Sequence, residues 1–378
     1  MIAPTAWGIF AGVISLQALQ VLANCECGYT VNANGTESAL YTEVLETDFS
    51  LTKDVSLDTD WVVQEWKVDS GPSHGPYGRE TKRANVIPNP SGNDKTKPQI
   101  GTNGSPAGIE LFVRKLQGNS QYVGVAEIDS ARTDMFYGSF RAGINVPKTK
   151  GTCAAFFWYF NDTQEIDMEI LTAQINDTSR PLHLVLHSPL SQQYGGDASQ
   201  TPYYQIKNLD FEPSNDMHEY RFDWSPGRVD FYADGKFIQS MQDDIYVPSA
   251  PGKIIMSHWS NGNSKWSGGP PDQDAAMTVS YVKAYFNSSN PTRKLDYKRR
   301  CKDRTALNMV CKIPDQQGPP NIGSVPFFYK DTTGDMTPNQ TIYARTAAKK
   351  KNVAASVTAG WTAIVVPVAA TLWFMGGF

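Results

Sequence analysis

The stretch Glu165-Ile166-Asp167-Met168-Glu169-Ile170 alternates acidic and apolar residues without a break. This is the period of a β-strand, in which successive side chains point to opposite faces. The sequence therefore predicts a strand with three carboxylates on one face and three apolar side chains entering a core on the other. Like charges along one face repel one another, so stability does not explain them and they indicate a chemical task.

The spacing of the two glutamates suits chemistry at a glycosidic bond. At a rise of ~3.3 Å per residue the Cα atoms of Glu165 and Glu169 lie ~13 Å apart, and the side chains lean together until the carboxyl groups are ~5 to 6 Å apart. Retaining glycosidases hold their two carboxyl groups ~5 to 5.5 Å apart, one to attack the anomeric carbon and one to protonate the leaving oxygen. The alternatives for this pattern are a solvated acidic edge strand and a calcium site.

From residue 109 onward, short apolar runs are separated by turn residues, and no long helical period appears. The runs are Ile109–Val113, Tyr122–Ile128, Phe136–Ile144, Cys153–Phe160, Glu165–Leu171, His183–His187, Tyr203–Leu209, His218–Trp224, Arg228–Ala233, Lys236–Met241, Lys253–Trp259 and Thr278–Asn287. Such spacing predicts an all-β antiparallel sandwich or barrel with few helices. The fragment Glu127-Ile128-Asp129 repeats half of the acidic pattern without a third acid, and we interpret it as structural.

Aromatic residues are predicted to lie beside the carboxylates. The run Cys153–Phe160 meets the acidic strand through the turn Asn161–Gln164, which forms a hairpin. From this hairpin Trp158 is a candidate platform for a sugar ring, with core packing as the alternative. Farther along, Trp259 and Trp266 bracket a Gly/Asn loop that contains Asn261, a composition that suits the rim of a sugar-binding cleft. His187 is a further candidate for the cleft.

The acidic stretch resembles the E-x-D-x-E signature of the family 16 glycoside hydrolases. Tyr137 and the following residues resemble the strand that precedes the catalytic hairpin in this family, and Met217–Lys236 resembles a scaffold block in which His218 is structural. Gly143 stands where many relatives carry arginine. The resemblance is close over residues 109–286 and loose over residues 40–108.

This resemblance implies a fold, a cleft and roles for the acids. The fold is a jelly-roll sandwich of two antiparallel sheets, similar to concanavalin A-like lectins and glucanases, with an open concave cleft for substrate. Glu165 is then the nucleophile, Asp167 assists it, and Glu169 is the acid/base. Tyr137, Trp158, His187, Trp259, Asn261 and Trp266 are the expected substrate-binding residues.

Composition limits the class of partner. The chain has 378 residues, 40% of them hydrophobic, and a formal net charge of −4. The negative charge does not favour nucleic acid or an anionic membrane surface, whereas a neutral polysaccharide is compatible with it. The sequence predicts no cofactor and no catalytic metal, and it leaves a structural calcium open without indicating one.

The ends of the chain resemble processing signals. Residues 1–23 lack charge, contain an apolar run and end in small residues, as a signal peptide does. Residues 353–378 form a small-residue spacer and an apolar tail, which predicts a signal for attachment of a GPI anchor. Between them we expect a catalytic sandwich over residues 24–290 and a basic stalk rich in Pro, Gly and Thr over residues 291–352.

The cysteines and sequons indicate an oxidising compartment. Among the five cysteines, Cys301 and Cys311 enclose a short loop and are able to pair, Cys25 or Cys27 is able to bridge to Cys153 or elsewhere, and one thiol is left over. Six N-x-S/T sequons agree with secretion. They are Asn34, Asn103, Asn161, Asn176, Asn287 and Asn339.

Together these features predict a secreted, GPI-anchored, monomeric enzyme at the outer face of the plasma membrane and in the cell wall. It would cleave or re-form β-glucosidic bonds in wall β-glucan, including glucan linked to chitin. The alternative from another class is a non-catalytic carbohydrate-binding wall protein on the same fold.

Overall fold

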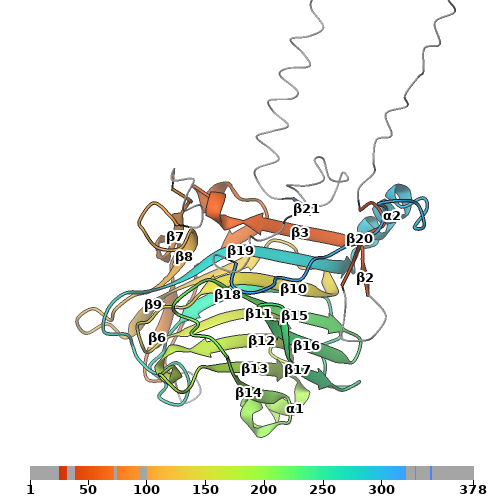
Figure 1. The fold of residues 1–378 in the computed structure, drawn as a ribbon. Coiled ribbons are helices and arrows are strands. Elements are labelled where there is room, and N and C mark those ends of the chain that lie inside the picture. The colour runs from red at the N-terminus through yellow and green to blue at the C-terminus, as the bar shows by residue number, and fades with distance from the viewer. Residues whose placement is uncertain are drawn as a thin grey trace, which may run out of the picture.

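Two large β-sheets form the body of the molecule in the computed structural model (Figure 1). The structure describes residues 25–31, 39–71, 75–92, 100–320 and 328, and the backbone of 341–342. Each large sheet contains nine strands, and nearly all neighbouring strands are antiparallel. The predicted fold class, an all-β sandwich of two antiparallel sheets, is confirmed.

The first large sheet carries the acidic strand near its middle, and several of its neighbouring strands are not consecutive in the sequence. The order is β14 (Tyr204–Asn208), β13 (Pro181–His187), β12 (Gln164–Leu171), β11 (Cys153–Asn161), β18 (Lys253–Trp259), β9 (Tyr122–Ser130), β6 (Gly78–Thr81) and β5 (Lys67–Val68), with β4 (Trp61–Val63) paired to β9. The strand β6 runs parallel to β9.

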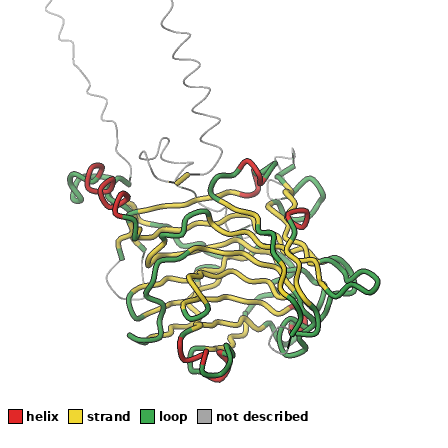
Figure 2. The backbone as a smooth tube through the Cα atoms, turned by 180° about the vertical axis from the view of Figure 1, so that it is seen from behind, coloured by secondary structure: helices red, strands yellow, loops and turns green. Residues whose placement is uncertain are grey.

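The second large sheet packs against the first through the core and closes the sandwich. Figure 2 shows from behind that strands make up most of the folded body. The order of the second sheet is β17 (Lys236–Gln242), β16 (Arg228–Ala233), β15 (His218–Ser225), β10 (Met135–Asn145), β19 (Ala275–Ser288), β3 (Glu43–Asp48) and β21 (Thr341–Ile342), with β8 (Gly108–Val113) paired to β19 and β7 (Val86–Asn89) paired to β8. A small sheet contains β2 (Leu40–Tyr41), β1 (Tyr29–Thr30) and β20 (Cys311–Lys312).

Helices are few and short in the described residues, as the sequence predicts. The α-helices are α1 (Pro189–Gln192) and α2 (Pro291–Arg300), and the 3-10 helices are η1 (Phe49–Leu51), η2 (Val55–Leu57), η3 (Arg83–Asn85), η4 (Thr172–Gln174) and η5 (Ala198–Gln200). No helix of the described residues has the length and hydropathy that crossing a membrane requires.

The core lies between the two large sheets and is built from the alternate, inward-facing residues of each strand. Ile166, Met168 and Ile170 of β12 all belong to it. Aromatic pairs join the sheets, because Phe156 of β11 lies 5.3 Å from Phe222 of β15 by ring centroids. The apolar half of the acidic strand therefore anchors it, which leaves the carboxylates on the outer face.

The segment after residue 290, predicted to be a stalk, is attached to the sandwich at least as far as residue 320. Helix α2 begins after Asn290, whose side chain accepts a hydrogen bond from the backbone of Thr292. Buried Glu43 binds Arg293 and Arg300 of this helix at 2.5 and 3.3 Å. Farther along the predicted stalk, the ring of Phe328 lies 5.8 Å from that of Tyr281 in β19. The other residues of the stalk after residue 320, both predicted processing signals and the sequons at Asn34 and Asn339 lie outside the residues whose side chains are described.

Two disulfides hold the same region and correct the pairings expected from sequence. Cys25 pairs with Cys311 and Cys27 with Cys301, with Cα separations of 5.1 and 4.6 Å. The expected Cys301–Cys311 loop and a bridge to Cys153 are therefore wrong. The parallel pairing of β1 with β20 brings the two distant ends of the chain together, which spacing in the sequence does not reveal. One thiol, Cys153, is left over as predicted.

Candidate active site

The three acids Glu165, Asp167 and Glu169 lie on the outer face of the first sheet, which we call the carboxylate face. Their register sets their neighbours: Glu165 pairs with Tyr159 and His187, Asp167 with Phe157 and Val185, and Glu169 with Ala155 and His183. In a sheet, side chains of paired residues lie on the same face. Each acid is therefore flanked by residues of β11 and β13 that also face outward.

Asp167 and Glu165 form a hydrogen-bonded pair. Burial, followed by the charges of Glu165 and Glu169, raises the pKa of Asp167 well above its usual range. Burial also raises the pKa of Glu165, and the hydrogen bond from Asp167 opposes that rise. The arrangement that satisfies both groups has the proton on Asp167, which donates to an ionised Glu165 carboxylate.

Glu169 has different partners and a pKa near neutrality. Burial raises the pKa of Glu169 to about 7, against the hydrogen bonds from the Cys153 thiol and the Trp266 indole and the positive charge of Arg79. The Cys153 sulfur lies 3.3 Å from Oε1 of Glu169. A carboxyl group with this pKa carries a proton in an appreciable fraction of molecules at pH 7, as a general acid requires.

His187, a predicted substrate-binding residue, lies beside the carboxylates. Its Nε2 lies 3.8 Å from Oδ2 of Asp167, an oxygen that is buried and has no hydrogen-bond partner among the described residues. Single ligand-type atoms of Glu165, Asp167 and His187 lie within 4.8 Å of one another. These three residues are the group able to hold a metal ion in the described part of the chain, but the proton on Asp167 opposes a cation there.

Trp259 and Trp266, also predicted to bind substrate, lie on the carboxylate face beside Glu169. Trp266 donates to Glu169, and its ring lies 5.3 Å from that of His183. Trp259 is the last residue of β18 and pairs with Cys153. Both tryptophans pack against the apolar cluster of Cys153, Ala155 and Leu171. Asn261 is 6% exposed, and its Oδ1 accepts from Asn263 and Ser267. Asn261 therefore builds the loop between the tryptophans.

Trp158 is not a sugar platform, and this prediction is wrong. It is fully buried, and its ring lies 4.4 Å from that of Trp224 in the opposite sheet. The reason is register, because Trp158 pairs with Ile166 and shares its inward face. The neighbouring positions, Phe157 and Tyr159, face the carboxylates instead.

Tyr137 was predicted to bind substrate, and this prediction is also wrong. It lies on β10 in the second sheet, where its ring packs 4.7 Å from that of Trp224. Tyr137 sits at an irregularity of the β10–β19 pairing and has a φ of 54°. The same strand holds Gly143, where an added Cβ would lie 2.4 Å from the ring of Tyr281.

Sequence reasoning missed several residues of this face. Cys153 has no motif, and its role appears only because β11 sets it beside Glu169. His183 binds the Tyr204 hydroxyl and Gln174 at 2.8 Å each. Glu127 was interpreted as structural, yet it lies on the carboxylate face in the same cross-strand row as Ala155 and Glu169. The alternation Glu127-Ile128-Asp129 was the available signal. The structural interpretation suits Asp129, which pairs with Lys253 at 2.5 Å.

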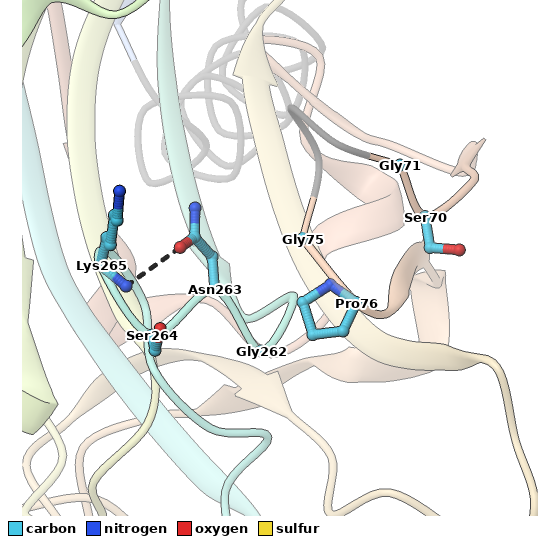
Figure 3. Close-up of a pocket in the computed structure, with 8 residues that line it drawn as sticks. All are labelled: Ser70, Gly71, Gly75, Pro76, Gly262, Asn263, Ser264 and Lys265. Carbon is cyan, nitrogen blue, oxygen red and sulfur yellow. Dashed lines mark hydrogen bonds between the residues drawn. The ribbon is translucent and has the colours of Figure 1, made fainter.

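A hollow of about 660 Å³ opens beside the loop that joins the two tryptophans (Figure 3). Ser70, Gly71, Gly75 and Pro76 line one side, and Gly262, Asn263, Ser264 and Lys265 line the other. Tyr77 donates from its backbone to the carbonyl of Asn261 across this boundary, at 3.1 Å. None of the three acids is among the residues that line the hollow.

Replacing Cys153 with alanine should move the alkaline limit of activity to higher pH. The thiol stabilises the charged form of Glu169, so its loss raises the pKa of that acid. A general acid is lost as pH rises through its pKa, and a net hydrogen bond of ordinary strength corresponds to a shift of about 0.5 to 1 pH unit. The pH profile of kcat/KM measures this shift. C153S retains a donor and should stay near the wild-type limit, whereas identical limits for C153A and wild type would remove the proposed coupling.

Fold and site together define a β-sandwich with a carboxylate-lined outer face, bordered by tryptophans, that suits binding and acid–base chemistry on carbohydrate. Residues 97–283, just under half of the chain, match the family model described as glycosyl hydrolases family 16. This segment contains β12 with all three acids, together with Trp259 and Trp266.

The curated relatives that this chain matches include β-glucanases. A β-glucanase of Acetivibrio thermocellus is 32% identical over 173 residues, 43% of this chain and 47% of the relative. A β-glucanase of Paenibacillus polymyxa is 32% identical over 138 residues, 35% of this chain and 52% of the relative. The chain thus spans about half the length of these relatives.

Among solved structures, the β-glucanase of Bacillus licheniformis has a TM-score of 0.46 at 20% identity, covering 64% of this chain and 97% of that one. The Crh5 transglycosylase in complex with NAG has a TM-score of 0.44 at 18% identity, covering 67% and 87%.

Proposed function

We propose that this chain is a family 16 retaining glycosidase or transglycosidase that acts on cell-wall β-glucan. The observation that carries the proposal is the pairing on one strand face of an acid near neutral pKa, Glu169, with a carboxylate, Glu165, that accepts a proton from Asp167. The β-glucanase relatives support β-glucan as the substrate class.

In the first step an oxygen of Glu165 attacks the anomeric carbon and forms an ester bond to it. The bond from that carbon to the leaving oxygen breaks, and the electron pair stays on that oxygen, which takes the proton of Glu169. Asp167 donates its hydrogen bond to Glu165 and orients it. After this step Glu169 is ionised and Glu165 is bound to the sugar as an ester.

In the second step a hydroxyl group attacks the same carbon from the opposite side. Glu169, now ionised, takes the proton of that hydroxyl, while the ester bond breaks and returns Glu165 to a carboxylate. Water as the attacking group gives hydrolysis, and a sugar hydroxyl gives transfer to a new chain. Two displacements at one carbon retain its configuration.

The protein's location is part of the proposal. The predicted signals at residues 1–23 and 353–378 support secretion and a GPI anchor, with the enzyme at the outer face of the plasma membrane and in the wall. The two disulfides support an oxidising compartment. We further propose that it works as a monomer, without a metal or other cofactor, because the proton transfers need only the three acids.

The test is turnover of a panel of β-1,3-, β-1,4- and mixed-linkage glucans and chitin oligomers, with a fluorescent oligosaccharide acceptor present. We expect one class of glucan to give shorter products or longer labelled chains, and the first product seen by NMR to keep the β configuration. Binding without turnover on the whole panel would favour a non-catalytic wall protein. A first product with inverted configuration would contradict the roles of Glu165 and Glu169.

A further inference from the structure

Arg79 lies on β6 toward one end of the first sheet, and its guanidinium group faces two tryptophans. The central carbon of this group lies 4.8 Å from the Trp259 ring and 5.4 Å from the Trp66 ring. Arg79 pairs with Val123 of β9, which belongs to a small apolar cluster that Trp259 packs against. The guanidinium therefore belongs to the surface that continues the carboxylate face beyond Glu127.

Arg79 lacks the ion pair with a carboxylate that the other buried or half-buried arginines of the described residues form. Its Nε is buried without a hydrogen-bond partner, and no carboxylate oxygen of the described residues lies within 4.0 Å of it. Every other described arginine that is buried or half-buried forms such an ion pair. These are Arg114, Arg132, Arg141, Arg180, Arg221, Arg228, Arg293 and Arg300.

An unpaired guanidinium in a sheltered position is unfavourable by itself. Burial lowers the pKa of Arg79, and the carboxylates of Glu127 and Glu169, in their ionised forms, oppose that change. The group has only donors, so what it lacks is an acceptor oxygen. Since the described residues do not provide one at Nε, a bound molecule is able to supply the acceptor.

Glu127 indicates which kind of oxygen fits. This carboxyl group accepts from the Trp66 indole at 3.0 Å and from Ser257. A sugar hydroxyl is able to accept from Arg79 while donating to Glu127, and the apolar side of the same ring is able to stack on tryptophan. A sugar that bears a carboxylate would instead be repelled by the ionised form of Glu127.

We propose that Arg79 is a specificity-determining residue that binds a hydroxyl group of a neutral sugar unit lying beyond the bond that is cleaved. This inference rests on the proposed function, because it concerns the same substrate. Four strand spacings separate β6 from β12, roughly 19 Å at ~4.8 Å each, and the arginine side chain bridges only part of that span. The unit bound by Arg79 is therefore not the one attacked by Glu165.

The experiment compares β-gluco-oligosaccharides from disaccharide to octasaccharide with wild type, R79Q and R79K. Wild type should gain kcat/KM as the substrate lengthens to reach Arg79. In R79Q that gain should fall about 10- to 100-fold, because a hydrogen bond to a charged group is lost. The shortest substrates should change less than about twofold when rates are compared well below pH 7, where Glu169 keeps its proton with or without the Arg79 charge. R79K should recover part of the gain, since lysine keeps the positive charge but lacks the planar set of N–H donors of the guanidinium group.

The matched control is R83Q, which removes an exposed arginine of the adjacent η3 that pairs with Glu65 at 3.7 Å. R83Q should leave the length dependence unchanged. Equal losses in R79Q for all lengths, or no loss for any, would overturn the proposal. A preference of wild type for uronate-containing oligosaccharides over neutral ones would also overturn it.

A binding measurement separates this inference from the proposed function. Calorimetry with the longest neutral oligosaccharide should show an affinity about 10- to 100-fold lower for R79Q than for wild type, whether or not the protein turns the sugar over. Bound sugar with no turnover, weakened by R79Q, supports Arg79 and rejects the enzyme. Turnover and binding that R79Q leaves unchanged reject Arg79 alone. Absence of both turnover and binding rejects both.

Discussion

Glu165→Gln should reduce kcat for glucan cleavage by about 10⁴-fold or more, since it removes the nucleophile of a two-step reaction. The substitution keeps the size of the side chain and its ability to accept from Asp167. It removes the charge that attacks the anomeric carbon, so the ester cannot form and neither hydrolysis nor transfer can follow. Initial rates on the best glucan of the panel measure the loss, and calorimetry on the same variant should show that oligosaccharide binding persists.

Asp162→Asn is a matched control for this loss. Asp162 lies in the hairpin turn between β11 and β12, accepts from the Tyr159 hydroxyl at 2.8 Å, and raises the pKa of Glu165 through its charge. Removing this nearby charge should change kcat by at most a few-fold, because Asp162 takes no part in bond formation. If E165Q retained wild-type turnover, Glu165 could not be the nucleophile and the mechanism would have to be abandoned.

Trp158→Ala should destabilise the protein by about 3 to 5 kcal/mol, the usual range for truncating a buried aromatic residue. Its ring fills the space between the sheets against Trp224 and is fully buried. The truncation leaves a cavity that neighbouring strands cannot close without shifting β11 and β12. Denaturant unfolding followed by tryptophan fluorescence measures the change in free energy.

Trp259→Ala tests a tryptophan of the carboxylate face, in contrast to Trp158 of the core. Trp259 is half-buried on the carboxylate face, so its truncation should lower affinity for oligosaccharides while costing less stability than W158A. The contrast between the two variants decides the placement of the aromatic residues. A W158A protein with wild-type stability and weakened sugar binding would show that Trp158 is exposed, contrary to the structure.

The pKa values on the carboxylate face explain how three acids on one strand divide their work. They share one cause, burial against the sheet, and differ in their partners. Asp167 receives no compensating donor and keeps its proton, whereas Glu169 receives two donors and a nearby positive charge. Activity is therefore expected to fall as pH rises through about 7, where Glu169 loses the proton that the leaving oxygen requires.

The sequence by itself determined the strand that carries the acids and the side of it that they share. The alternation of Glu165 to Ile170 has a period of two, which is a local property of a chain in a sheet and needs no information about distant residues. The same local signals predicted the turn before β12 and the succession of short strands. They therefore predicted the fold class, and they brought Trp259, Trp266 and His187 into the candidate site.

Only the tertiary structure decided which neighbours those acids have. The register between β11 and β12 turned Trp158 inward and Cys153 outward, a difference of odd and even positions that a run of apolar residues does not encode. The pairing of β1 with β20 chose the disulfides, and the order β12-β11-β18-β9-β6 brought Glu127 and Arg79 to the same face as Glu169. Contacts between segments far apart in the chain depend on how whole sheets pack, so no local pattern specifies them.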